Sequence, residues 1–213
     1  MFEELKQSVI TGDEQKAASL TQGLLEQGVD PQKVLKEGLA AGMDVVGARF
    51  KCYEMWLPEV ILAAKAMKAA TTLLKPYLEK SGGTMRLGKI VIATVEGDVH
   101  DIGKNLVSMM LESAGFEMAD LGVNVKVSAI AEAASREKAD IVGLSALLTT
   151  TMLAMKPAIK AIRGASPKVK VMVGGSPITQ EFANETGADG FAPDALRAIN
   201  LAKGLMGARG PIE

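Results

Sequence analysis

Apolar residues in the first 80 positions recur at the three- and four-residue spacing that is typical of amphipathic helices. Asp13 and Asp30 each stand where a helix N-cap is expected, and Pro31 suits a first helical turn. Helices are predicted over 2–10, from Asp13 through residue 25, over 31–50, and from Pro58 through residue 74. Together they predict a four-helix bundle. In its last helix one buried stripe is expected, made of Leu57, Val60, Ile61, Ala64, Met67, Thr71 and Leu74.

Beyond residue 88 the pattern changes to short β-like runs that alternate with helical ones. Strands are expected over 90–94, 117–121, 141–145, 170–173 and 190–191, with helices over 104–114, 128–138, 152–163, 180–186 and 194–206. Strict alternation of strand and helix predicts a five-stranded, doubly wound parallel sheet, a Rossmann-like α/β fold. Ligands of such folds bind at the carboxyl ends of the strands.

Glycines and polar residues separate the two patterns. The run over 81–88 includes Gly82 and Gly83 and suits a flexible connection that can serve as a hinge. We therefore predict a helical cap domain over 1–80, a linker over 81–88 and a Rossmann-like domain over 89–213.

Composition and charge narrow the class of protein. The chain has 213 residues, with 24 Lys and Arg against 25 Asp and Glu, so a sequence-independent grip on nucleic acid is not expected. One histidine and one cysteine exclude a Cys/His zinc site within one chain. No apolar run is long enough to span a membrane, and the start lacks the order of a secretory signal, so a cytoplasmic protein is expected.

The single histidine, His100, follows the first predicted strand in the run Gly97-Asp98-Val99-His100-Asp101-Ile102-Gly103. An imidazole two residues from a carboxylate, at the carboxyl end of a strand, is typical of a metal ligand with an orienting partner. Taken alone, the same run also fits a solvated loop histidine beside an acidic helix cap.

Two further motifs end other predicted strands. Ser145-Ala146-Leu147 closes the third, and Gly174-Gly175 closes the fourth. Each is common by itself, as a helix cap or a tight turn. Between Gly103 and Ser145 lie 41 residues, 104–144, and between Leu147 and Gly174 lie 26, 148–173.

This ordered set resembles the fingerprint of corrinoid-binding proteins, Asp-x-His-x-x-Gly, then Ser-x-Leu, then Gly-Gly at about these intervals. The wider run over 93–105 is similar to the cobalamin modules of methyltransferases, including that of cobalamin-dependent methionine synthase. The helical half is similar too, at Phe50 and in Trp56-Leu57-Pro58-Glu59.

The resemblance implies a cobalamin bound with its own lower base displaced from cobalt and buried as a tail, and with His100 in the vacated position. Asp98 would accept the second imidazole proton, and the hydroxyl of Thr151 would extend that relay. The remaining implied cofactor-binding residues of the sheet domain are Gly97, Asp101, Ile102, Gly103, Ser145, Leu147, Thr149, Gly174, Gly175, Phe191 and Ala192. Among these, Gly103, Gly174 and Gly175 would line the tail channel, and Ser145 would contact the buried base. Leu147 would form a wall, and Thr149 would lie near the corrin rim or the tail.

Above the ring, the resemblance implies that Phe50 and Leu57 cap a cobalt-bound methyl group. The expected function is that of a methyl carrier cycling between Co(I) and methyl-Co(III), which does not turn over alone. Expected partners are a donor-specific methyltransferase and an acceptor methyltransferase, of TIM-barrel type, and a reductive activator protein. The methyl donor stays open.

Two other functions share the His100 motif. One is the small subunit of an adenosylcobalamin-dependent mutase, although such modules generally lack a helical cap. The other is a cobalamin-dependent sensor, although the Glu-His that light sensors place after a bundle tryptophan is replaced here by Lys65-Ala66-Met67.

Overall fold

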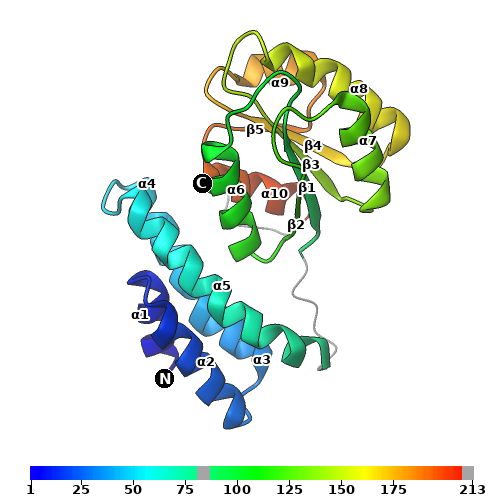
Figure 1. The fold of residues 1–213 in the computed structure, drawn as a ribbon. Coiled ribbons are helices and arrows are strands. Elements are labelled where there is room, and N and C mark those ends of the chain that lie inside the picture. The colour runs from blue at the N-terminus through cyan, green and yellow to red at the C-terminus, as the bar shows by residue number, and fades with distance from the viewer. Residues whose placement is uncertain (81–86, 208–213) are drawn as a thin grey trace. The chain divides into compact units, whose positions relative to one another are not determined.

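The computed structural model describes residues 1–80 and 87–207, and the chain divides into two compact units, Met1–Met85 and Arg86–Glu213. Figure 1 shows a helical first unit and a second unit built on a sheet. The glycines expected to form a hinge, Gly82 and Gly83, lie outside the described residues.

The helical unit contains four helical rods. These are α1 (Phe2–Ile10), α2 (Glu14–Glu26), a composite of α3 (Pro31–Lys33), η1 (Val34–Ala40) and α4 (Ala41–Lys51), and α5 (Leu57–Lys80). The caps act as the sequence predicts: the Asp13 carboxylate accepts from the Lys16 amide, and the Asp30 carboxylate accepts from the Gln32 amide. At the start of α5 the Glu59 carboxylate reaches back to the Trp56 amide, as in one half of a capping box.

The third rod is not the plain α-helix that its spacing predicts, because Val34–Ala40 forms a π-helical segment. Gly38 and Gly42 of this rod allow α1 to approach closely. A Cβ at Gly38 would lie 2.6 Å from Leu5 Cδ2, and one at Gly42 would lie 2.9 Å from Val9 Cβ. Sequence periodicity hardly distinguishes 3.6 residues per turn from a local π turn, which explains the difference.

The core of the helical unit lies between α5 and the other rods. Val60, Ala64, Met67 and Leu74 of the expected stripe are buried, as predicted. Ile61 and Thr71 are half-buried, and Leu57 is 38% exposed, so the stripe is not buried along its whole length.

The sheet unit has five parallel strands in the order β2-β1-β3-β4-β5. The strands are β1 (Lys89–Thr94), β2 (Glu117–Asp120), β3 (Ile141–Ser145), β4 (Lys170–Gly174) and β5 (Gly190–Ala192). The helices are α6 (Ile102–Ser113), α7 (Val127–Arg136), the short η2 (Met152–Ala154), α8 (Met155–Ala165), α9 (Gln180–Thr186) and α10 (Ala195–Leu205). The predicted fold class is confirmed.

Helices cover both faces of this sheet, as Figure 1 shows, with α6 packed against α10 and α7 against α8. Alternating residues of β1 therefore enter two different cores. Val91 and Ala93 join the core beneath α7 and α8. The strand order reverses between β1 and β3, so the loops after these two strands diverge to opposite faces and leave a crevice for a ligand between them.

Candidate functional site

The loop after β1 carries His100 and is folded by its own short-range contacts. Gly97 has a φ of +84°, which a glycine adopts without strain. The Asp98 amide donates to the Val95 carbonyl at 3.1 Å, and the Thr94 hydroxyl donates to the His100 carbonyl at 2.9 Å. The end of β1 thus fixes the backbone on which the histidine stands.

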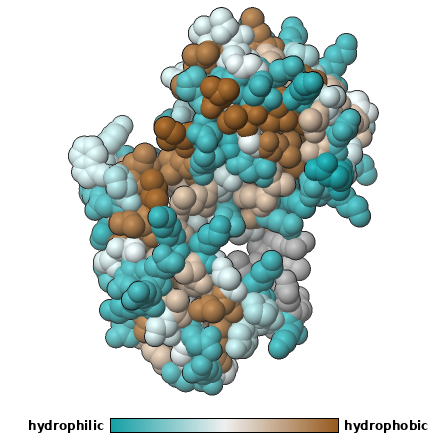
Figure 2. All heavy atoms as spheres, in the orientation of Figure 1, coloured by the Kyte–Doolittle hydropathy of each residue, from teal (hydrophilic) through white to brown (hydrophobic). Residues whose placement is uncertain are grey.

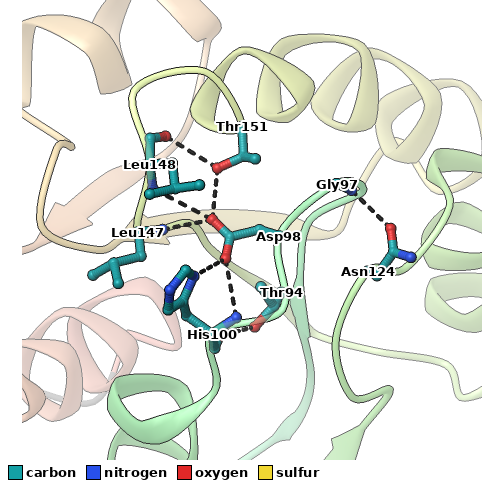
Figure 3. A network of polar contacts seen from close by, with 8 residues as sticks. All are labelled: Thr94, Gly97, Asp98, His100, Asn124, Leu147, Leu148 and Thr151. Atoms are coloured by element: carbon teal, nitrogen blue, oxygen red, sulfur yellow. Dashed lines mark hydrogen bonds and ion pairs between the residues drawn. The ribbon is translucent and has the colours of Figure 1, made fainter.

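The Asp98 carboxylate is completely buried and is the centre of the site, as Figure 3 shows. Its Oδ1 accepts from the His100 amide at 3.0 Å and lies 2.8 Å from His100 Nδ1. Its Oδ2 accepts from the Thr151 hydroxyl at 2.6 Å, from the Leu147 amide at 2.8 Å and, more weakly, from the Leu148 amide at 3.4 Å. One carboxylate therefore joins the loop after β1 to the loop after β3.

The protonation state of Asp98 decides the state of the imidazole. Burial raises the pKa of the Asp98 carboxyl, but hydrogen bonds from Thr151, Leu147 and His100 outweigh it and hold that pKa well below its usual range. The ionised carboxylate can only accept, so His100 Nδ1 carries the proton and donates it. In the neutral ring this leaves the lone pair on Nε2, which is the atom available to a metal.

The histidine side chain is 46% exposed, and the surface around it is apolar. The exposed hydrophobic residues on the loops after β1 and β3, and in the helical turns that follow them, are Val99, Ile102, Leu147, Leu148 and Leu153. Ile102 alone is 85% exposed, and Figure 2 shows hydrophobic side chains at the surface of the sheet unit. An exposed apolar patch of this kind marks a binding site, and the corrin ring that the sequence resemblance implies would lie against it.

The glycines of the fingerprint differ in what surrounds them. A Cβ at Gly103 would meet nothing within 4 Å, so this position leaves open space beside the first turn of α6. A Cβ at Gly175, where φ is +125°, would lie 1.9 Å from the Ala146 carbonyl oxygen. A Cβ at Gly174 would lie 2.9 Å from the Ala192 carbonyl oxygen. The pair at the end of β4 is thus packed closely against backbone, whereas Gly103 has open space beside it. The predicted role of all three in a tail channel stays a prediction.

Other predicted site residues lie around the same edge of the sheet. Ser145 is half-buried at the end of β3 and lies in register with Thr94 and Gly174. Thr149 is exposed in the loop that follows. On β5, Phe191 is half-buried and Ala192 is buried.

Asp101, at the N-cap position of α6, is exposed. Its carboxylate accepts from the side-chain amide of Asn105 at 3.0 Å, so this group is engaged within its own helix.

Phe50 and Leu57 belong to the helical unit and stay predictions. Phe50 is half-buried near the end of α4, and Leu57 is the first residue of α5. Between them, Tyr53 has a φ of +59°, and both it and Trp56 are largely exposed.

Sequence reasoning missed one polar neighbour of the histidine loop, Asn124. Its side-chain oxygen accepts from the Gly97 backbone amide at 2.8 Å, and its backbone amide donates to the Asp98 carbonyl at 2.8 Å. The signal available in the sequence is an asparagine two residues after Gly122, a composition typical of turns with positive φ.

In residues 1–80 and 87–207 no helix is both long enough and apolar enough to cross a membrane.

Comparison with known proteins gives matches over both units. Residues 88–200 match a family described as B12 binding domain, and residues 1–75 match a second family with the same description. The chain is 42% identical to a corrinoid protein of Desulfitobacterium hafniense over 97% of its own length and 98% of that protein's. It is 46% identical to the dimethylamine corrinoid protein of Methanosarcina barkeri over 84% of both chains.

Among solved structures, a cobalamin-binding protein from Desulfitobacterium hafniense DCB-2 aligns with a TM-score of 0.79 and 32% identity, over 96% of this chain and 98% of that one. The methanol:cobalamin methyltransferase complex from Methanosarcina barkeri aligns with a TM-score of 0.84 and 30% identity, over 98% of this chain and 80% of that chain.

Proposed function

This chain belongs to the corrinoid proteins of methyltransferase systems and binds a corrinoid cofactor, and on that premise we propose that it carries methyl groups between methyltransferases with His100 as the lower ligand of cobalt. The observation that carries the proposal is how the imidazole is held: a buried carboxylate binds Nδ1, while the side chain stays 46% exposed on a loop that also presents apolar residues. The corrinoid supplies the methyl-carrying chemistry, and the protein supplies ligation and shielding.

Asp98 fixes the tautomer of His100 and makes the imidazole a more basic ligand. Thr151 donates to the same carboxylate and keeps it from rotating away. A base-off cofactor needs room for its tail, and the open space at Gly103 supports a tail that descends beside α6, with Ser145 near its base. Phe50 and Leu57 are proposed to shield the upper face of the ring.

The proposed partners are a methyltransferase that holds the donor, another that holds the acceptor, and a reductive activator. Support comes from the solved methanol:cobalamin methyltransferase complex, which aligns with 98% of this chain. The donor belongs to the partner enzyme. Relatives at 40–46% identity are named for dimethylamine and for trimethylamine, so no donor is assigned to this chain.

The test is the spectrum of protein reconstituted with cobalamin. Wild-type protein is expected to show nitrogen hyperfine coupling from an imidazole in the Co(II) state, because the cofactor's own base is displaced. His100→Ala should lose this coupling. Glu96→Ala, at an exposed position of the same loop, should keep it. An unchanged spectrum in His100→Ala would contradict the proposed ligation.

A further inference from the structure

Asn124, in the segment between β2 and α7, contacts two backbone groups of the histidine loop, the Gly97 amide and the Asp98 carbonyl. Asn124 accepts the Gly97 amide proton with its side-chain oxygen and donates its own amide proton to the Asp98 carbonyl, each at 2.8 Å. Figure 3 draws the first of these contacts, between Gly97 and the Asn124 side chain. Asn124 thus grips the backbone on both sides of the Gly97–Asp98 peptide.

Residue type at this position is restricted by two separate requirements. The backbone of Asn124 has a φ of +51°, a region that few residues other than Gly, Asn and Asp adopt readily. The contact with Gly97 also needs a short side chain that ends in an acceptor. Glycine meets only the first requirement, whereas asparagine and aspartate meet both.

Asp120, the last residue of β2 and just before this segment, holds the chain where the histidine loop leads into α6. Lys104 directly follows Gly103, and its side chain is 2% exposed and ion-paired with Asp120. The other oxygen of Asp120 accepts from the Gly122 amide at 2.8 Å. Asp120 and Asn124 therefore lie on the two flanks of the stretch from Gly97 to Lys104.

This segment is itself fixed to the end of β1. The Thr94 amide donates to the Gly122 carbonyl at 3.0 Å, and the Val125 amide donates to the Thr94 carbonyl at 3.1 Å. A rigid support on β1 is what a positioning element requires.

We propose that Asn124 is a positioning residue. It fixes the backbone position of Asp98 so that the carboxylate contacts His100 Nδ1 and the Leu147 amide at the same time. The inference rests on the proposed function, in which His100 ligates cobalt. Replacing Asn124 removes the side-chain contact with the Gly97 amide, which no fingerprint residue supplies, and leaves the backbone contact with the Asp98 carbonyl to hold this loop alone. The imidazole then loses its fixed tautomer and its aim.

The single histidine of the chain allows a direct test without cofactor. Proton–nitrogen NMR of the His100 ring is expected to show one neutral tautomer, with the proton on Nδ1. Asn124→Gly keeps the backbone geometry accessible but removes the acceptor, and should show a mixture of tautomers. Asn124→Asp retains the acceptor and should restore the single tautomer. Lys138→Gly, at another position with positive φ (52°), is the matched control and should leave the ring signals unchanged.

Cofactor titration gives a second measurement. Asn124→Gly should weaken cobalamin binding by about 10-fold, the lower end of effects seen for residues that orient a metal ligand, and Asn124→Asp should recover most of it. Wild-type ring signals and affinity in Asn124→Gly would overturn the proposal, whereas failure of the ligation itself appears only in His100→Ala. If the glycine variant does not fold, hydrogen exchange of the Gly97 amide in wild-type protein decides: slow exchange supports the contact, and exchange at the rate of a free amide refutes it.

Discussion

The two ends of the parallel sheet use their charged residues in opposite ways. At the amino end, charges are paired with one another. Lys89 lies 2.7 Å from Glu137 and 3.2 Å from Glu117, and Arg163 lies 2.7 Å from Asp189. Lys89 and Glu117 begin neighbouring strands, and Glu137 directly follows α7. Arg163 lies in α8, and Asp189 directly precedes β5, so these pairs have a structural role.

At the carboxyl end Lys104 and Asp120 also form an ion pair, but Asp98, the carboxylate at the centre of the site, is not paired with a lysine or an arginine among the described residues. Asp98 is held by two backbone amides of the β3 loop, a threonine hydroxyl and the histidine, and the surface around it is apolar and exposed. The comparison teaches that mutations at the amino end should change stability alone. Mutations at the carboxyl end should separate cofactor binding from stability.

The largest effect is expected at Gly175, which is closely packed against backbone and is also predicted to line the tail channel. Gly175→Val places a side chain 1.9 Å from the Ala146 carbonyl oxygen at a φ of +125°, so we expect a loss above about 4 kcal/mol, enough to unfold a marginal domain. Thermal unfolding followed by circular dichroism measures it. A folded variant that merely loses the cofactor would show that the glycine serves the tail channel and that the backbone can yield.

Gly103 should show the opposite behaviour. A Cβ at Gly103 meets no neighbouring atom within 4 Å, and leucine adds helix propensity, so in Gly103→Leu the stability without cofactor should stay or rise by about 0.5–1 kcal/mol. The new side chain fills the proposed tail cradle, and cobalamin should no longer be retained on gel filtration. Gly164→Leu, an open helical glycine of α8, is the control and should retain it. Retention by Gly103→Leu would place the tail elsewhere.

Asp98→Asn tests how far ligation depends on charge. Asparagine keeps one accepting oxygen but replaces the other with a donating NH₂ group, so one set of donors loses its acceptor, and we expect cofactor affinity to fall by about 10- to 100-fold while binding persists. Equilibrium titration with cobalamin measures the change, with Glu96→Gln as the exposed control. Equal affinities in the two variants would show that the imidazole is aimed by packing alone.

Asp189→Asn tests the amino end and carries a pH signature. Burial raises the pKa of Asp189, but the hydrogen bonds from the Val171 amide and the Arg163 guanidinium together lower it by more, so the net shift of the pKa is downward. The folded state then binds protons less readily than the unfolded state, and the stabilisation is present above the ordinary carboxyl pKa of about 3.9 and is lost as pH falls below it.

Substitution should therefore cost about 1–3 kcal/mol at pH 7, and the difference from wild type should shrink as the pH approaches about 2. Urea unfolding across this pH range measures it. Cobalamin affinity at pH 7 should not change, and a loss of affinity would break the proposed separation between the two ends.

The smallest effect is expected in the helical unit. Leu57 is 38% exposed, so Leu57→Ala and Phe50→Ala should change stability little. If these residues shield the upper face of the cofactor, light-driven loss of the methyl group should accelerate in the double variant. Photolysis at the wild-type rate would remove them from the site, while binding at His100 would stand.

Much of the fold follows from local patterns. Alternating strands and helices, with Asp13, Asp30 and Asp194 at helix starts, predict the element order, because capping and periodicity act within a few residues. The π-helical segment was not predictable in this way, since it depends on how closely α1 packs against Gly38 and Gly42. Nor does local sequence explain Gly175, whose constraint is a carbonyl on the neighbouring strand's loop.

For the site, the motif identifies His100 and Asp98 but not what holds them. The Leu147 amide lies 49 residues beyond Asp98, and Asn124 reaches Gly97 across 27 residues. Such contacts depend on strand order and loop direction, which the spacing of motifs does not specify.

The carboxylate of Asp98 also couples the electronic state of the His100 imidazole to the Leu147 amide, because it contacts both. When Nε2 gives electron density to a bound metal, the Nδ1 proton becomes more acidic and its bond to Asp98 strengthens, because hydrogen bonds in a network polarise one another. The same carboxylate then has less negative charge to offer the Leu147 amide, whose protection against hydrogen exchange should decline. The ligation state of the histidine is thereby transmitted to the loop after β3 without passing through the hydrophobic core.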